Sequence, residues 1–301
     1  MPNYAFFEPV IIFTLMNIAM VLGLYVTAMS GQLSMATAAI AGVGGYASGV
    51  LTVKFGLPFI LSVVAAATLA ALVGTALALI TAKMRDFILK LTTLAFGEAL
   101  SVLAFNWDYI GGANSFTGLT LYTGVGTALI GALIALFVAW RFDRSRLGFA
   151  ARAVRDDPLA AASMGISIVE IRAITFALGA ALVGMGGAMQ AHYVLVISPH
   201  ELGFFVSLNY IIFLLFGGMY TLWGPILGAI ILTVLPETLR FANEYRMILY
   251  GLIIVAVVLW HPEGLIRRRP TKTDRAPDIN LGNEPRPTIS TDELLTPQTT
   301  R

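Results

Sequence analysis

Residues 141–170 read Arg-Phe-Asp-Arg-Ser-Arg-Leu-Gly-Phe-Ala-Ala-Arg-Ala-Val-Arg-Asp-Asp-Pro-Leu-Ala-Ala-Ala-Ser-Met-Gly-Ile-Ser-Ile-Val-Glu. This is the one long polar interruption between apolar segments, so we expect it to lie in water. Within it, Asp157 precedes Pro158, and Gly165 follows a run of mostly small side chains. An Asp at the N-cap, a Pro at the first helical position and a Gly just past the end are typical of a short helix. The sequence therefore predicts a helix of about two turns over residues 158–164.

The predicted helix is too short to be stable alone in water, because helix nucleation is costly and few hydrogen bonds follow it. It carries no charge between Pro158 and Met164, so it needs a surface to pack against. Two interpretations are open at this point. The helix packs back on its own membrane domain, or it is a coupling helix that sits in a groove of a separate soluble subunit.

The composition is that of an integral membrane protein. Of the 301 residues, 57% are hydrophobic and 12% are charged, against about 25% charged in soluble proteins, and the mean hydropathy is +0.82. The apolar runs are about 15 to 25 residues long, which is the length a helix needs to cross the bilayer core. Continuous apolar runs favour helices over barrel strands, which alternate apolar with polar residues. The absence of cysteine excludes disulfides, thiolate chemistry and cysteine-bound metals.

The apolar runs predict an all-α, polytopic membrane protein with about nine membrane segments. These segments cover approximately residues 9–29, 30–51, 57–82, 87–106, 121–140, 171–194, 202–219, 224–239 and 247–260. Small residues dominate the second segment, which predicts a tightly packed or broken helix, and they recur in the sixth and eighth. The glycines assigned to close helix contacts are Gly42, Gly45, Gly49, Gly184, Gly224 and Gly228.

The placement of the basic residues predicts a topology. Under the positive-inside rule, the turn after the third segment, the loop at 141–170 and the arginines after the last segment lie in the cytoplasm. The N-terminus is then outside and the C-terminus cytoplasmic, although the first segment must be inverted if residues 33–51 enter and leave by one face. We divide the chain into a transmembrane domain at 1–262 and a disordered cytoplasmic tail at 263–301, which is too polar to fold alone.

Glu98 is the ionisable residue placed deepest in a predicted segment, near the expected membrane midplane. A charge at that depth is costly and usually faces a cavity or a partner. Glu98 therefore either lines or braces a solute pathway, or it is protonated or hydrogen-bonded where it fixes helix contacts. We group Gln32, Ser34 and Thr93 with Glu98 as candidate pathway residues.

The sequence lacks the motifs of several other functions. No Gly-Lys pair occurs, so the phosphate-binding P-loop is absent and any ATP chemistry must come from another polypeptide. The three histidines share no ligand spacing, so we expect no metal site. No catalytic residue is assigned, and the basic cluster after the last segment suits orientation and lipid headgroups better than nucleic acid. The rival interpretation is a self-sufficient secondary carrier or channel with Glu98 as a proton relay.

Several short motifs follow one another over about residues 20–260. They are Ser-Gly-Gln-Leu-Ser at 30–34, Leu-Thr-Thr-Leu-Ala-Phe-Gly-Glu at 91–98, Asn106-Trp107, Arg144-Ser-Arg-Leu-Gly148, Arg155-Asp156-Asp157-Pro158, Met164-Gly165-Ile166, His192-Tyr193, Ile197-Ser198-Pro199, and Leu222-Trp223-Gly224-Pro225 with Gly228. Together and in this order, they resemble the LivM family of branched-chain amino-acid ABC importer permeases. The domain at 1–262 would then be a permease domain of ABC importer fold, in a bacterial inner membrane.

The resemblance implies a set of partners and a class of solute. A second, homologous permease of the LivH type would pair with this chain in the lipid bilayer. Two cytoplasmic ATPase subunits would bind ATP and Mg, so that this chain itself holds no cofactor, and a periplasmic binding protein would deliver the solute. Leucine, isoleucine or valine is the implied cargo, whereas related permeases carry urea, short amides or other small organic acids.

The coupling segment of ABC importers generally carries Glu-Ala-Ala, then three residues, then Gly. Here Leu159, Ala160, Ala161 and Gly165 occupy those places, so the glutamate is missing. The resemblance still implies a docking helix that ATP binding by the partners moves as a rigid lever, which drives alternating access. The residues assigned to this coupling role are Asp157, Pro158, Leu159, Ala160, Ala161, Met164, Gly165 and Ile166.

Overall fold

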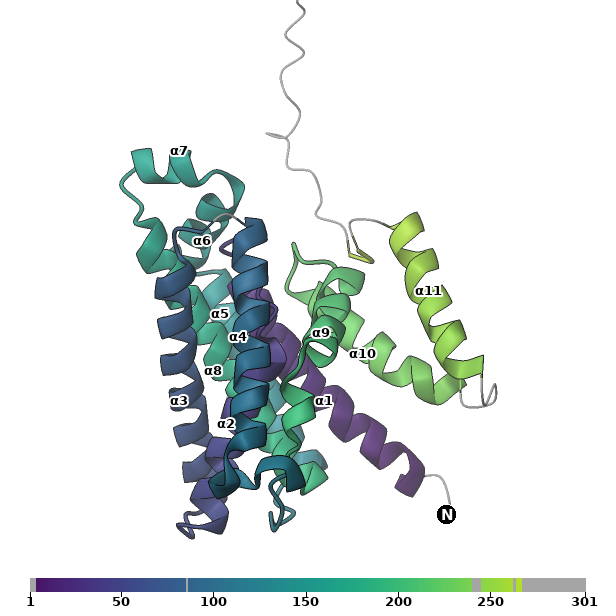
Figure 1. Cartoon of the computed structure of the whole chain (residues 1–301). Coiled ribbons are helices and arrows are strands. Elements are labelled where there is room, and N and C mark those ends of the chain that lie inside the picture. The colour runs from purple at the N-terminus through teal and green to yellow at the C-terminus, as the bar shows by residue number, and fades with distance from the viewer. Residues whose placement is uncertain (1–3, 85, 240–244, 262–263, 267–301) are drawn as a thin grey trace, which may run out of the picture. The chain divides into compact units, whose positions relative to one another are not determined.

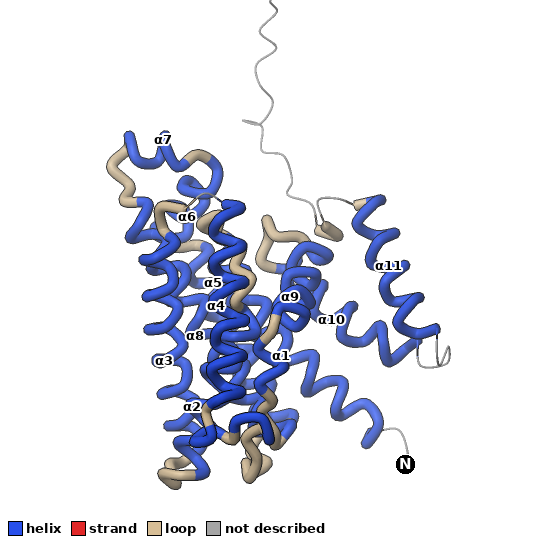
Figure 2. The backbone as a smooth tube through the Cα atoms, viewed as in Figure 1, coloured by secondary structure: helices blue, strands red, loops and turns tan. Residues whose placement is uncertain are grey.

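The structure is a computed structural model that describes residues 4–84, 86–239, 245–261 and 264–266 (Figures 1 and 2). The α-helices are α1 (Tyr4–Ala28), α2 (Thr37–Val53), α3 (Phe59–Thr81), α4 (Asp86–Asn106), α5 (Val125–Asp143), α6 (Arg146–Asp156), α7 (Pro158–Ser163), α8 (Ile168–Val194), α9 (Phe204–Gly217), α10 (Trp223–Thr238) and α11 (Arg246–Trp260). Short 3-10 helices are η1 (Asp108–Ile110), η2 (Gly112–Asn114) and η3 (Pro199–Leu202). Within this part of the chain, extended pairing is limited to an isolated antiparallel bridge between Phe116 and Ile197.

Helix α8 lies at the centre of the core, where it packs against α1, α2 and α3. Its glycines allow neighbouring backbones to approach closely, as small residues do in membrane helices. A Cβ atom on Gly179 would meet the carbonyl oxygen of Gly23 in α1, and one on Gly187 would meet that of Ala41 in α2. These contacts fix how α1, α2 and α8 pack, and therefore where the residues between them lie.

The two ends of the bundle differ. Figure 1 shows α7 at one end and the loop that follows α4 at the other. The turn after α3 belongs to the α7 end, because Arg172 of α8 donates a hydrogen bond to the carbonyl of Ala82. Helix α1 also finishes there, since the Tyr25 hydroxyl donates to the Asp143 carboxylate at the end of α5. The turn after α3 and the segment between α5 and α8 thus share one end.

The chain breaks between α1 and α2, over residues 29–36. Gly31 has a φ of +79°, a conformation that glycine adopts without strain. The Met35 N–H leaves the helical pattern and donates to the Thr93 hydroxyl of α4 at 3.0 Å. The second predicted segment, which began at Ser30, is therefore a broken helix whose helical part begins only at Thr37.

Helix α2 continues away from the α7 end. Beyond its last residue, the Lys54 ammonium donates a hydrogen bond to the carbonyl of Tyr109, which lies in the loop after α4. Gly49 lies against the Phe116 ring in the same loop. The chain from the break to Lys54 therefore runs from one end of the bundle toward the other.

Helices α9 and α10 pack through glycines. A Cβ on Gly217 would meet the Gly224 carbonyl oxygen, and a Cβ on Gly228 would meet the carbonyl of Phe213. After α11, the N–H of Leu265 donates to the carbonyl of Phe216 at 3.0 Å. The chain thus comes back to the C-terminal end of α9 before the described residues end.

The segment between the fifth and sixth predicted spans contains more helix than the one short helix that the sequence predicted. Helix α5 extends to Asp143, α6 fills Arg146–Asp156 and α8 begins at Ile168. Helix α6 is amphipathic, with Ala151 and Val154 fully buried, Arg146 exposed, and Arg152 and Arg155 partly buried. The many charged residues of α6 indicated that this segment lies in water. They also concealed the helical spacing of its few buried positions.

Each of the nine predicted segments contains a helix, but they differ in length. Helices α1, α3, α4, α5 and α8 include stretches of 19 to 27 residues that are long and apolar enough to cross a membrane. The apolar parts of α2, α9, α10 and α11 have 10–17 residues. The polytopic helical fold is confirmed, while the count of nine spans stays a prediction. The predicted tail, apart from residues 264–266, lies outside the described residues.

Candidate functional site

Helix α7 has the ends that its sequence predicted. The Asp157 carboxylate accepts hydrogen bonds from the N–H groups of Leu159 at 2.9 Å and Ala160 at 3.0 Å. Pro158 occupies the first helical position, where no hydrogen bond is lost. Gly165 follows the helix with a φ of +82°. Both ends are thus satisfied locally, without help from the membrane helices.

The faces of α7 differ in exposure. Ala161 is 3% exposed and belongs to the core, and Ile166 packs against the same core. Leu159 and Met164, in contrast, are 82% and 83% exposed. One face of the segment therefore packs on its own domain, while two large apolar side chains are left without cover in the isolated chain. Exposed apolar groups of this kind indicate a protein contact when they gather on one element.

Helix α6 connects α7 to the membrane helices through charged groups. Arg152 forms a salt bridge with Asp143 at 2.5 Å, and the same carboxylate oxygen accepts from the Tyr25 hydroxyl at 3.2 Å. The Arg155 guanidinium lies over the Tyr220 ring, 5.0 Å from its centre. These contacts join α6 to α1, to α5 and to the turn after α9. A displacement of α7 can therefore reach α1 through side chains that are already in contact.

Three of the four predicted pathway residues lie at the break between α1 and α2. Gln32, Ser34 and Thr93 are at most 2% exposed. The Ser34 hydroxyl accepts from the Ala36 N–H, and the Thr93 hydroxyl accepts from the Met35 N–H. Both hydroxyls therefore satisfy backbone groups that the break leaves outside a helix. The Gln32 amide nitrogen, by contrast, is buried and has no hydrogen-bond partner in the described part of the chain.

Glu98 lies apart from these three residues. Its side chain is exposed in the isolated chain, and its carboxylate accepts a hydrogen bond from the Phe204 N–H at 2.8 Å. Phe204 is the first residue of α9, so Glu98 caps that helix and lies at the positive end of its dipole. This geometry matches a carboxylate that braces α9.

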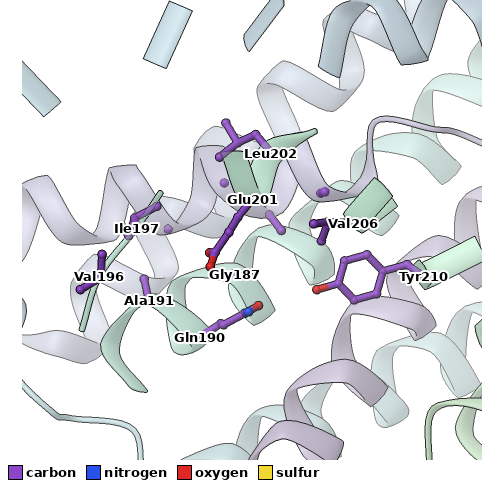
Figure 3. A pocket seen from close by; sticks show the side chains of 13 residues that line it. Gly187, Gln190, Ala191, Val196, Ile197, Glu201, Leu202, Val206 and Tyr210 are labelled. Atoms are coloured by element: carbon purple, nitrogen blue, oxygen red, sulfur yellow. The ribbon is translucent and has the colours of Figure 1, made fainter. Parts of the chain in front are cut away.

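A cavity of about 210 Å³ lies beside α9. Its lining comes from α2, α8, η3, α9 and the chain just before η3, and comprises Ala38, Ala41, Gly42, Gly45, Gly187, Gln190, Ala191, Val196, Ile197, Glu201, Leu202, Val206 and Tyr210. Figure 3 shows the polar ends of Gln190, Glu201 and Tyr210 directed toward the same space. The cavity thus combines small or apolar walls with three convergent polar groups, which is the usual composition of a small-molecule site.

Glu201 carries no counter-charge of its own. Its carboxylate forms no salt bridge or hydrogen bond among the described residues. The residue as a whole is exposed in the isolated chain, but partial burial of the carboxyl raises its pKa above the ordinary value. The side chains of Gln190 and Tyr210 likewise use no hydrogen bond within the described part of the chain. The three groups are therefore free to bind a solute or water.

Sequence reasoning missed Gln190, Glu201 and Tyr210. Glu201 was given no role, and the seventh segment was expected to begin only at Leu202. The available signal was a carboxylate between Pro199 and Gly203, in a connection too short to leave the bundle. Gln190 and Tyr210 gave no signal, since only the fold brings α8 and α9 to one cavity.

The predicted packing glycines occupy several helix contacts. Gly42 lies against Leu202, and Gly45 faces α8; both line the cavity. A Cβ on Gly184 would meet Ala70 of α3, and one on Gly224 would meet the Gly218 carbonyl. Substitution at Gly42, Gly184 or Gly224 would therefore force a neighbour to move.

His192 takes part in helix packing. Its Nδ1 lies 3.2 Å from the Thr120 carbonyl, so this nitrogen donates, and Nε2 accepts from the Ser48 hydroxyl at 3.0 Å. The described residues contain no group of three or more His, Cys, Asp or Glu placed to hold a metal ion. Both ring nitrogens are thus occupied by contacts that hold α2, α8 and the loop before α5 together.

Comparison with known proteins identifies the family. Residues 8–258 match the family described as branched-chain amino acid transport system / permease component. The chain is 29% identical to the high-affinity branched-chain amino acid transport system permease protein LivM of Escherichia coli (strain K12), over 84% of this chain and 68% of that protein. It is 26% identical to the probable branched-chain amino acid transport permease protein LivM of Methanocaldococcus jannaschii, over 71% and 70% of the two chains.

A second kind of permease is also related. The LivH permease protein of Salmonella typhimurium is 29% identical over 54% of each chain. Matches to both LivM and LivH indicate that transport systems of this family contain a second, homologous permease. No solved structure matches the chain. The predicted family and the multi-pass inner-membrane location are confirmed, and the chain belongs to the permease components of branched-chain amino acid transport systems.

Proposed function

We propose that this chain is the membrane-spanning permease subunit of an ATP-driven importer for leucine, isoleucine, valine or a similar small solute. Family membership supports transport, and α7 supports the source of energy. The observation that carries the proposal is the exposure of Leu159 and Met164 on a capped helix at one end of the bundle. This helix offers an apolar contact to a partner that binds nucleotide, which the chain itself has no P-loop to bind.

The proposed partners complete the transporter. Two cytoplasmic ATPase subunits hold ATP and Mg and receive α7, and a LivH-type permease encloses the pathway from the other side. A periplasmic binding protein delivers the solute. Helix α7 and the residues after α11 then face the cytoplasm, and lipid covers the exposed apolar side chains of α3 and α5, such as Ile60, Leu72 and Phe137.

The proposed coupling runs through contacts of α6. When the ATPases close on ATP, they displace α7, and Ala161 carries the movement into the core that it packs against. Arg152, which is salt-bridged to Asp143, then passes the movement to Tyr25 at the end of α1. The break that follows α1 is the point where the chain can change direction without disturbing a helical hydrogen-bond ladder. Alternating access follows from the resulting shift of helices against one another.

Two substitutions test the coupling role. Gly165→Pro requires a φ that proline cannot adopt, and Ala161→Asp places a charge in a buried contact, so each should reduce ATP-dependent uptake of labelled leucine to background. The protein should remain in the membrane, as measured by immunoblot of membrane fractions. The control is Gly56→Pro, because Gly56 also has a positive φ and open space around it but lies between α2 and α3. Normal uptake by the α7 variants, with normal assembly, would refute the coupling role.

The same assay separates the rival functions. Uptake by the purified chain in vesicles without ATPase partners would favour a secondary carrier or channel, whereas dependence on ATP would reject it. Competition by unlabelled urea, short amides or small organic acids would reveal a different cargo. The contact of Glu98 with the start of α9 supports bracing of that helix and gives a proton relay no support.

A further inference from the structure

The cavity beside α9 is of a size that excludes large ligands. Its volume of about 210 Å³ lies below the range of roughly 300–1,000 Å³ that is typical of sites for drug-sized molecules. Ala38, Ala41, Gly42 and Gly45 form one wall from α2, and Val206 faces the space from α9. Such walls accept a short aliphatic group, because they are apolar and carry no bulky side chain.

The polar groups of the cavity have complementary chemistry. The Glu201 carboxylate accepts hydrogen bonds only, when ionised, and attracts cations, whereas the Gln190 amide and the Tyr210 hydroxyl can each donate. They come from three different elements, and their polar ends converge in Figure 3. An internal void left by imperfect packing would be lined by apolar groups, which stay dry. Three convergent polar groups with unused hydrogen-bonding capacity instead indicate a place for a polar ligand.

We infer that this cavity is a binding subsite for a small solute that carries both an ammonium group and a short aliphatic chain. Glu201 pairs with the ammonium, and Gln190 and Tyr210 donate to an acceptor such as a carboxylate on the same solute. The small walls from α2 and the Val206 side chain cover the aliphatic part. This inference rests on the proposed function and deepens it, since it gives the solute a place in this chain.

The charge of the cavity discriminates among the solutes considered above. A solute whose one charged group is a carboxylate would be repelled by Glu201, and no Lys or Arg lines the cavity to compensate. Urea and short amides would be accepted without the gain of a charge pair. The cavity therefore favours amino acids over simple organic acids, because a charge-assisted hydrogen bond is about twice as strong as a neutral one.

The first test compares two glutamates. The complete importer, with its second permease and ATPases, is reconstituted in proteoliposomes with the binding protein, and uptake of labelled leucine is measured beside ATP hydrolysis. Glu201→Gln should lower uptake about tenfold, as expected for a lost hydrogen bond to a charged group, while Glu201→Asp should retain a larger part. Glu8→Gln in α1 is the control, because Glu8 is exposed and does not line the cavity, and uptake should stay within about twofold.

The outcomes of this test are distinguishable. Wild-type uptake together with unchanged uptake by Glu201→Gln would overturn the subsite and leave the proposed function intact. A wild-type complex that hydrolyses ATP but never accumulates leucine, isoleucine or valine would overturn the proposed cargo, and the subsite with it. Retained ATP hydrolysis in Glu201→Gln shows that the complex has assembled, so that its loss of uptake reports on the cavity.

A second measurement does not depend on transport. The chain contains no cysteine, so Val206→Cys, made with cysteine-free partners, gives a single labelling site in the cavity. A cationic methanethiosulfonate should label it faster than an anionic one, relative to Ala113→Cys at an exposed position of η2. Isopentylamine should protect the cysteine and 4-methylpentanoate should not. Equal labelling by both reagents, or equal protection by both solutes, would overturn the subsite.

Discussion

The α6–α7 segment and the cavity beside α9 differ in how far apart in the sequence their contacting residues lie. In α7, the capping bonds join residues that are two or three positions apart, such as Asp157 with Leu159 and Ala160. The cavity, in contrast, needs α2, α8, η3 and α9 to meet through residues as distant in sequence as Ala38 and Tyr210. The first region can therefore move as a unit without losing its internal bonds. The second changes its shape whenever those helices shift.

These two regions fit an importer in which coupling to the ATPases and binding of the solute take place at different sites. Helix α7 is small, locally capped and partly exposed, so a partner subunit can bind it. The walls that α2 and α8 give to the cavity are mostly glycine and alanine, which let backbones lie close and leave few side chains to disengage when helices slide. A rigid lever at one end and a deformable space between helices are what alternating access requires. Each substitution below acts on one region and should leave the other intact.

Among the milder substitutions that separate the two regions, the largest effect is expected from Gly187→Ala, which acts on the cavity. The added methyl group would meet the Ala41 carbonyl oxygen and force α2 away from α8. Overpacking of this kind costs about 1–3 kcal/mol, so we expect a lower melting temperature of the purified protein and a loss of uptake of about tenfold or more. Thermal unfolding in detergent and leucine uptake in vesicles measure the two effects.

Gly251→Ala is the matched control for this substitution. Gly251 also lies inside a helix, but no atom lies within 4 Å of the position that its Cβ would take. Because alanine is a better helix former than glycine by about 1 kcal/mol, this variant should be unchanged or slightly more stable. If both variants behaved alike, the close contact of α2 with α8 would not matter for the cavity.

An intermediate effect is expected from Asp143→Asn, which acts on the connection between α7 and α1. The substitution removes the charge that pairs with Arg152, whose side chain is 25% exposed. A lost hydrogen bond between charged groups costs roughly 1.5–3 kcal/mol when it is buried, and less here because of the partial exposure. Uptake should fall several-fold while ATP hydrolysis continues, because α7 would move without carrying α1 along. The ratio of solute transported to ATP hydrolysed measures this effect.

A double substitution sharpens that result. Arg152→Gln alone should resemble Asp143→Asn, and the combined variant should be no worse than either, since both remove the same interaction. Additive losses would show that the two residues act separately, and would remove the link between α6 and the end of α1. Tyr25→Phe, which removes the other hydrogen bond to Asp143, should give a smaller loss of the same kind.

The sequence predicts a region well when its contacts join residues that are close in the chain, and poorly when they join distant ones. Helix α7 was predictable because Asp157, Pro158 and Gly165 are read within nine positions, and the helical membrane segments because their apolar runs are continuous. The small residues of the second segment predicted a tightly packed or broken helix, and the structure shows the break before α2. Glu98 was placed by depth alone, and only the fold shows its contact with Phe204. Glu201 carried only the signal of a carboxylate in a short connection. Gln190 and Tyr210 could not be predicted, because nothing local indicates that η3 and the helices on either side of it enclose one space.

The smallest effect is expected from Asp157→Ala, which removes the cap of α7 and leaves its position unchanged. Loss of an N-cap costs about 1 kcal/mol, and uptake should fall by about two- to fivefold, whereas Asp157→Ser should restore most of it. Ser145→Ala is the matched control, since Ser145 caps α6 through the Gly148 N–H but α6 is also anchored by Arg152. A helix this short depends on its cap in the free chain and much less once a groove surrounds it. Hydrogen exchange of α7 should therefore rise in the isolated Asp157→Ala protein and return toward the wild-type value in the complex with ATPases; a rise of equal size in both would mean that no partner encloses α7.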